Sequence, residues 1–262
     1  MSDYVYCFAR TDELRLDGLT GLGGSVVRRL AHGNFSAVIS ELAPDFQPNP
    51  DRSSALAHNS VVNAVLAEST PVPCRFGNVI ERAQLLDFME SNAPLLLGLL
   101  ERFSGHLEMD IRVVLAMEGT PEGDTGQADK VANHGNEAIG AGTRFLREKQ
   151  IRKAAEDLRR KRLEEAIDRI DARFLDRISD KALLTNAHGI VAGTAHLIRR
   201  DDLKEHRSMF EQTSSSFADD VKISLSGPWA PYSFVPGLRL PAAKAKSTDQ
   251  SGRPSGVTVG AK

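Results

Sequence analysis

The sequence predicts an α+β protein organised in two domains. Strand-like and helix-like patterns mix along the chain without a strict alternation of strand, helix and strand. A stretch rich in Gly, Asp and Thr, EGTPEGDTGQADKVANHG, interrupts these patterns from residue 118, and a long helical pattern comes after it. We therefore expect an N-terminal α+β domain over 1–118, a flexible linker over 119–140, a C-terminal domain over 141–240 and a disordered tail over 241–262.

The elements of the N-terminal domain follow from local patterns. YVYCF (4–8) is aromatic and β-branched, as strands are. Two strand-like runs, 25–30 and 35–42, flank AHGN, whose Gly33 suits a tight turn, so they predict a hairpin. Apolar residues at helical spacing predict a helix that Asp51 or Ser53 caps and that ends near 68. Further helices are expected over 81–90 and 94–103, an extended segment over 70–80 and a strand over 106–117.

The C-terminal domain begins with a long helix. Apolar residues recur at three- and four-residue steps from 141 to 179. HGIVAGTAHLI (188–198) has the composition of a strand, and DDLKEHRSMFEQTSS (201–215) predicts a helix with acidic residues at its N-terminus. Val221, Ile223 and Leu225 alternate within 219–227, which predicts a half-buried strand.

Composition limits the classes of partner. The formal net charge of −2 provides no overall attraction to nucleic acid or to an anionic membrane. Cys7 and Cys74 lie far apart in apolar surroundings, as buried free thiols do in a reducing compartment. The N-terminus shows no secretory signal pattern, and the longest apolar run, 93–100, is too short to cross a bilayer. We expect a cytoplasmic protein without a nucleic-acid or membrane partner.

Patterns typical of enzymes are missing from the sequence. The glycine-rich stretch GLGGS (21–25) matches neither the dinucleotide-binding pattern nor the P-loop. The seven histidines show no zinc-binding spacing, and no serine lies in GxSxG. We therefore expect no catalytic residue, metal, cofactor or small-molecule substrate. The alternative is a soluble enzyme with an unrecognised small-molecule site in the interdomain cleft.

The basic cluster RRKR (159–162) within the long helix raises the question of nucleic acid. Acidic residues surround it, and i,i+4 pairs of opposite charge favour a solvated helix face; these are Glu156–Arg160, Asp157–Lys161 and Glu165–Arg169. A nucleic-acid role for the 144–177 helix is the weaker interpretation. The same amphipathic helix could instead lie against a protein partner.

A first distinctive segment is PVPCRFGNVI (71–80). Pro73 and Gly77 fix the backbone, so that Arg75 and Phe76 project from a stiff loop. An arginine in such apolar surroundings needs a carboxylate if it is buried. We expect Arg75 to form an ion pair with Glu108, or with Glu81, and this ion pair to hold the loop on the core. In the alternative, the projecting arginine and phenylalanine form part of a protein-binding surface.

A second distinctive segment is GPWAPYSFV (227–235). Gly227 ends the preceding strand and Pro228 stiffens the backbone after it, while Trp229, Tyr232 and Phe234 can each bury about 150–250 Å². We expect this segment to lie in the groove between the domains and to clasp them together. If Trp229 is fully buried, its removal should cost about 3–5 kcal/mol.

In this order, the segments resemble those of the gas vesicle protein F/L family (GvpF and GvpL). The resemblance covers about 3–236 and consists of YVYCF, AVIS, VPCRFGNVI, SGHLEMDIRV, GTRFLREK and SGPWAPYSFV. Cys74, Asn78 and Ala230 depart from the residues expected at their positions. The PxRFG and GPWxPYSF segments are specific in combination, whereas the hairpin alone is weak.

The resemblance implies a non-enzymatic component of gas vesicle formation. It implies that the C-terminal domain is a modified ferredoxin-like fold with a long helical extension. It also implies association with the hydrophobic shell protein GvpA and with other accessory Gvp proteins, at the gas vesicle and near the gas-facing side of its shell. The sequence does not distinguish an F-like from an L-like member.

Overall fold

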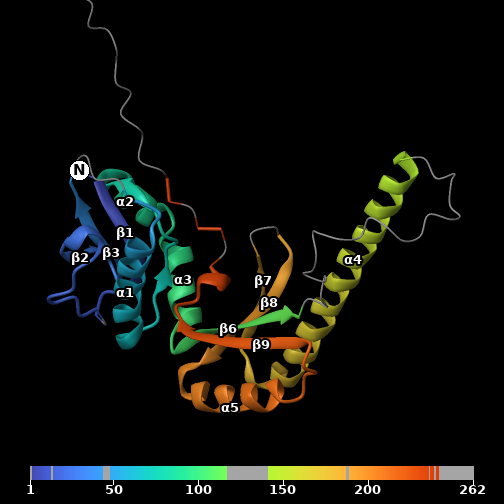
Figure 1. The fold of residues 1–262 in the computed structure, drawn as a ribbon. Helices are drawn as coiled ribbons and strands as arrows, with labels where there is room; N and C mark the ends of the chain where they lie inside the picture. Colours follow the sequence, from blue (N-terminus) through green and yellow to red (C-terminus); the bar gives the residue numbers. More distant parts are fainter. Residues whose placement is uncertain are drawn as a thin grey trace, which may run out of the picture.

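The computed structural model describes residues 2–12, 14–43, 48–116, 141–186, 189–235, 237–238 and 240–241. The predicted linker over 119–140 and all but the first residue of the predicted tail lie outside these residues. The described residues form two β-sheets with helices packed on them, so the α+β class is confirmed. Figure 1 shows the sheets side by side, with one long helix projecting from the second.

The first sheet belongs to the N-terminal part of the chain. Its order is β2-β3-β1-β4, and β5 also pairs with β1. The predicted hairpin is confirmed, since β2 and β3 pair antiparallel around Gly33, which has a φ of 58°. The strands are β1 (Ser2–Arg10), β2 (Val27–His32), β3 (Phe35–Leu42), β4 (Val72–Pro73) and β5 (Val79–Glu81).

Helices cover both faces of the first sheet. Helix α1 (Arg52–Glu68) packs on one face, and α2 (Arg82–Ser91) and α3 (Ala93–Phe103) pack on the other. Asp51 caps α1 as expected, because its carboxylate accepts a hydrogen bond of 2.8 Å from the Ser54 N–H. Strand β1 is therefore buried along both sides, from Asp3 to Ala9.

The second sheet is antiparallel throughout. Its spatial order is β7-β8-β6-β9, and the chain order of its elements is β6, α4, β7, β8, α5, β9. Helices α4 and α5 pack on the same face and bury a core that includes Ile111, Ile170 and Phe174. The elements are β6 (His106–Leu115), α4 (Ala141–Phe174), β7 (Asp180–Thr185), β8 (Val191–Arg199), α5 (Leu203–Ser214) and β9 (Val221–Trp229).

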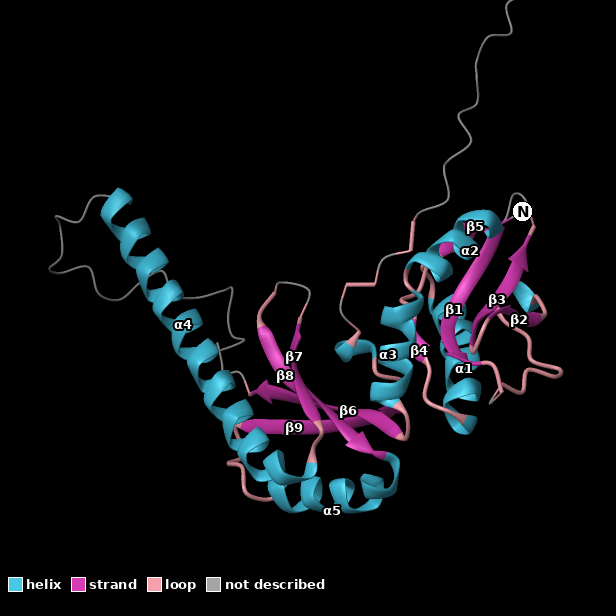
Figure 2. Cartoon of the chain, turned by 180° about the vertical axis from the view of Figure 1, so that it is seen from behind, coloured by secondary structure: helices cyan, strands magenta, loops and turns pink. Residues whose placement is uncertain are grey.

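The pairing of β6 corrects one expectation. The sequence boundary at 118 assigned this strand to the N-terminal domain, but β6 lies between β8 and β9 in the second sheet. Strand β7 was not expected, and the predicted helix over 141–179 ends at Phe174. Figure 2 shows that α4 runs past the edge of the second sheet, and its described side chains from 145 to 160 are exposed.

Candidate functional site at the junction of the two sheets

The two distinctive segments meet where the first sheet adjoins the second. After β9, the chain forms a short 3-10 turn, η4 (Tyr232–Phe234), beside α3 (Figure 1). Phe234 is 7% exposed and belongs to one core cluster with Phe103 of α3 and Leu197 of β8. Ala230 is fully buried in the second cluster, together with residues of β1, α1 and β6. The segment 230–234 therefore packs against elements of both sheets.

Glu108 holds this turn through two hydrogen bonds. Its carboxylate accepts a bond of 2.8 Å from the Ser233 N–H and another of 2.8 Å from the Ser233 hydroxyl. Glu108 is only 3% exposed, and this burial raises its pKa to about 7 despite the two donors. The negative charge of nearby Asp110 acts in the same direction. β6 thus supplies a buried carboxyl group that binds both the backbone and the hydroxyl of Ser233 in η4.

His58 connects the other distinctive loop to η4. Its Nε2 lies 3.1 Å from the Cys74 carbonyl oxygen and 3.3 Å from the Tyr232 hydroxyl, and its Nδ1 lies 2.9 Å from the Tyr4 hydroxyl. A carbonyl can only accept, so Nε2 carries a proton. The Tyr4 oxygen in turn accepts a 3.1 Å bond from the Gly77 N–H. Burial lowers the pKa of His58 to about 4, so the imidazole is neutral near pH 7 and its Nδ1 accepts from the Tyr4 hydroxyl.

Aromatic contacts and the hydrogen bonds around His58 hold the loop PCRFG (73–77) in place. Phe76 is half-buried, with its ring centroid 6.1 Å from that of Tyr4 and 6.0 Å from that of His58. Gly77 has a φ of 95°, a conformation that strongly favours glycine. Pro73 lies in β4 opposite Cys7 of β1. The loop therefore leaves the first sheet directly beside Tyr232.

Two expectations about these side chains are wrong. Arg75 is exposed, and Glu108 binds Ser233 in place of an arginine. Trp229 is only half-buried, and its Nε1 lies 3.4 Å from the Ser226 hydroxyl. It lies opposite Glu108 on β9, a strand at the edge of the sheet. The anchoring aromatic of the segment is Phe234.

Gly227 lies inside β9, which runs on to Trp229, so the expectation that this glycine ends the strand is wrong. Its φ is 119°, in the region that favours glycine, and it precedes Pro228. A Cβ at this position would lie 2.8 Å from the Glu108 carbonyl oxygen and 2.9 Å from the Met109 sulfur. Both contacts are too short for a carbon atom, so the close approach of β9 to β6 depends on the absence of a side chain here.

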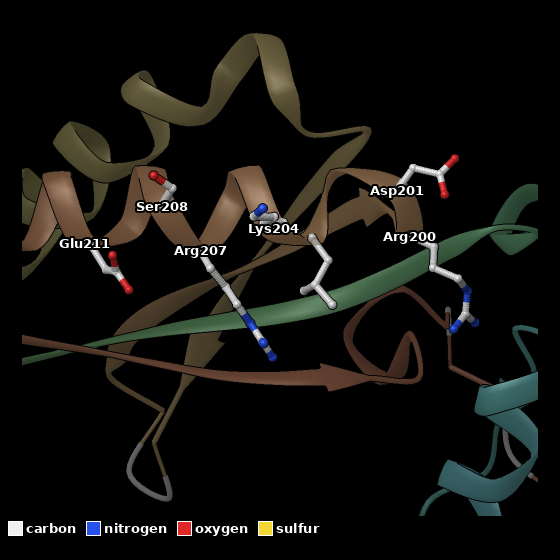
Figure 3. A pocket seen from close by; sticks show the side chains of 7 residues that line it. Arg200, Asp201, Lys204, Arg207, Ser208 and Glu211 are labelled. Carbon is white, nitrogen blue, oxygen red and sulfur yellow. The ribbon is translucent and has the colours of Figure 1, made fainter.

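The cavities near the junction are small or open. A cavity of about 140 Å³ is lined by Pro73, Arg75, Tyr232 and Leu238, among others. A larger one of about 480 Å³ lies on the exposed side of α5 (Figure 3). The side chains drawn there, including Lys204 and Arg207, spread along the helix and do not converge on one point. Among the described residues, no group of three or more His, Cys, Asp or Glu side chains is placed to hold a metal ion.

A second buried histidine cluster lies beneath α4, outside the junction. His196 of β8 contacts His206 of α5 at 3.1 Å and the Asp171 carboxylate at 3.1 Å. Lys181 of β7 lies 2.5 Å from the other oxygen of that carboxylate. The cluster joins four elements of the second sheet and its helices. Burial lowers the pKa of His206 to about 4.

The two buried histidines predict a loss of stability in acid. Burial lowers the pKa of both His58 and His206 from 6.5 to about 4, so the unfolded chain binds protons more readily than the folded one. Their contribution is present above pH 6.5 and is lost as the pH falls towards 4, by at most about 3 kcal/mol each. Urea unfolding between pH 7.5 and about 4.5 measures this slope. The slope should be shallower in His58→Gln and in His206→Gln; an unchanged slope in both variants contradicts the assignment.

Sequence reasoning missed His58 as the centre of the junction, although a signal was present. His58 precedes Val61, Val62 and Val65 at steps of three, four and seven residues, so it shares the buried face of α1. The roles of Tyr4 and Ser233 had no such signal. Their contacts join residues 54 and 125 positions apart along the chain.

Comparisons with known proteins place the chain in a family. The family model described as gas vesicle synthesis protein GvpL/GvpF matches residues 3–236. A gas vesicle protein L from a Streptomyces species is 27% identical over 254 residues, covering 88% of this chain and 92% of the relative. Gas vesicle protein F of Haloferax mediterranei is 24% identical over 243 residues, covering 90% and 94%.

Two crystal structures share the fold. GvpF from Anabaena sp. PCC7120 aligns with a TM-score of 0.67 at 16% identity, over 89% of this chain and 97% of that one. GvpF from Microcystis aeruginosa aligns with a TM-score of 0.65 at 19% identity, over 89% and 98%. Within the described part of the chain, no helix is both long enough and apolar enough to span a bilayer. The chain belongs to the GvpL/GvpF family of gas vesicle synthesis proteins.

Proposed function

We propose that this protein is a non-enzymatic accessory or minor structural component of the gas vesicle, which binds the shell protein GvpA and supports assembly. The family match over residues 3–236 carries the proposal. A shell subunit with exposed apolar surfaces aggregates unless another protein covers those surfaces before assembly. Other accessory Gvp proteins are further proposed partners, and the place of action is the vesicle, near its gas-facing side.

The junction supports a binding role by joining two modules into one platform. We propose that the modules are two domains and that the second is a modified ferredoxin-like fold extended by α4. The chain order β6-α4-β7-β8-α5-β9 and the antiparallel order of its four strands agree with that fold. On this proposal the domain boundary lies near Gly105, before β6, and not at 118.

The alternative is an enzyme with a small-molecule site between the modules. The side chains of η4 fill much of that space, since Phe234 is 7% exposed and Ser233 is bound to Glu108. The cavity that remains beside Tyr232 is about 140 Å³, whereas sites for small ligands typically measure about 300–1,000 Å³. These dimensions favour the binding role over the enzyme.

The proposal predicts retention of the shell protein in a co-expression experiment. Tagged chain and untagged GvpA are expressed together, and a tagged soluble protein of similar size serves as the control. We expect GvpA to be recovered with this chain and not with the control. Deletion of the gene in a host without a paralogue should abolish or malform vesicles, and the intact gene should restore them.

The variant Glu108→Gln distinguishes the binding role from the enzyme. Glutamine has nearly the same shape as glutamate and keeps a carbonyl acceptor, but it cannot act as an acid. The binding role predicts normal vesicles from this variant, whereas an enzyme that used the buried acid would fail to support them. Normal vesicles in the clean deletion strain, or GvpA that is never retained, contradict the proposal.

A further inference from the structure

Helix α4 carries apolar side chains that do not pack on its own sheet. The row that packs there consists of Leu163, Ala166, Ile167, Ile170 and Phe174. Further out, Ile151 is 62% exposed and Leu158 is 61% exposed. The outer half of the helix projects from the rest of the chain in both views (Figures 1 and 2). At about 100° per residue, Leu158 points about 140° away from Leu163, so it belongs to a different face.

This second face has the spacing of a coiled-coil seam. Its residues succeed one another at steps of four, three, four, three and four, so that each two successive steps span seven residues, as in a heptad repeat. All of them are exposed. We call them the outer row, which consists of Arg147, Ile151, Ala154, Leu158, Lys161 and Glu165.

The outer row is complementary to itself in the antiparallel direction. Positions 147 and 165, 151 and 161, and 154 and 158 are each placed symmetrically about residue 156. Two antiparallel copies crossing at 156 therefore set Arg147 against Glu165 twice. They also set Leu158 against Ala154 twice, a large side chain against a small one. A parallel pair would oppose identical residues and place arginine against arginine and lysine against lysine.

We propose that α4 pairs with α4 of a second copy of this chain, as an antiparallel two-helix coiled coil centred on residue 156. The interface is two-fold symmetric and therefore closes at a dimer. Ile151 lies beside the aliphatic stem of the partner's Lys161. Within one chain Lys161 already lies 3.7 Å from Glu165, an exposed contact that leaves Glu165 available to a second cation. Only two large aliphatic residues per chain enter the seam, so the dimer is weak.

Sedimentation of the full-length chain tests the charge pattern. We expect a reversible monomer–dimer equilibrium whose dissociation constant rises about tenfold in Arg147→Glu and in Glu165→Arg. The double variant R147E/E165R restores the opposite charges, so its dissociation constant should return to near that of the wild type. Arg152→Glu is the matched control, because Arg152 is an exposed cation of the same helix outside the outer row. A chain that stays monomeric at ~0.5 mM overturns the proposal.

Cysteine pairs test the direction and the register. Two differently tagged chains carry Ala154→Cys and Leu158→Cys respectively, while the native Cys7 and Cys74 are buried. Mild oxidation of the mixture should form the mixed disulfide far faster than either chain alone forms a disulfide with itself. Faster self-linkage of the Ala154→Cys chain indicates a parallel pair and overturns the proposal. Equal effects of R147E and R152E overturn it as well.

Discussion

Replacement of Phe234 by alanine should lower the free energy of unfolding by about 3–4 kcal/mol. Phe234 is 7% exposed and lies in a core cluster that includes α3 on one side and Leu197 of β8 on the other. Truncation leaves a cavity at the place where the two sheets adjoin, and the rigid elements around it close only partly. Urea unfolding followed by circular dichroism measures the change.

Trp229→Ala is the matched control for this prediction. Trp229 is half-buried, and its indole makes one long contact with Ser226. Its removal should therefore cost about 1–2 kcal/mol, less than the about 3–5 kcal/mol expected of a fully buried tryptophan. A Trp229→Ala variant that is as unstable as Phe234→Ala would contradict the assignment of Phe234 as the anchor.

Replacement of Glu108 by alanine should have the second largest effect, about 2–4 kcal/mol. The change removes the acceptor of both the Ser233 N–H and the Ser233 hydroxyl, each at 2.8 Å, and leaves the two donors in a partly buried turn. Glu108→Gln keeps a carbonyl acceptor of nearly the same shape. It should cost less than about 1 kcal/mol, because the raised pKa already favours a neutral group at this position.

The pH dependence of stability shows whether the charge or only the shape of Glu108 stabilises the junction. Its folded-state pKa is raised from 4.5 to about 7, so its contribution to stability is present below 4.5 and is lost as the pH rises through 7. Between pH 6 and 8, the free energy of unfolding of the wild type should therefore fall relative to that of Glu108→Gln. If E108Q is as unstable as E108A at every pH, the junction needs the carboxylate charge and this account of Glu108 is wrong.

Sequence patterns predicted the elements whose formation depends on residues that are close together in the chain. The hairpin of β2 and β3 follows from two strand-like runs around Gly33, and the half-buried face of β9 follows from Val221, Ile223 and Leu225. The sequence did not predict strand β7, because DKALLT is short and contains few of the β-branched and aromatic residues that are enriched in strands. Its register comes from pairing with β8, which is a contact that local propensity does not encode.

The sequence predicted the two segments of the candidate site but not the contacts between their side chains. Both distinctive segments lie at the junction, but the partner of Glu108 is Ser233 and not Arg75. The sequence shows that a buried carboxylate needs donors, and a backbone N–H is as good a donor as a guanidinium. Only the fold decides which of the two is near. The partial burial of Trp229 is likewise decided by the fold and not by the local sequence.

We expect the segment 230–234 to join the two sheets into one cooperative unit. Trp229 on β9 reports on the second sheet, and the two buried thiols, Cys7 on β1 and Cys74 directly after β4, report on the first. A urea titration monitored at once by tryptophan fluorescence and by pulsed thiol labelling compares them. We expect coincident transitions in the wild type and separate ones in Phe234→Ala. Separate transitions in the wild type would contradict it.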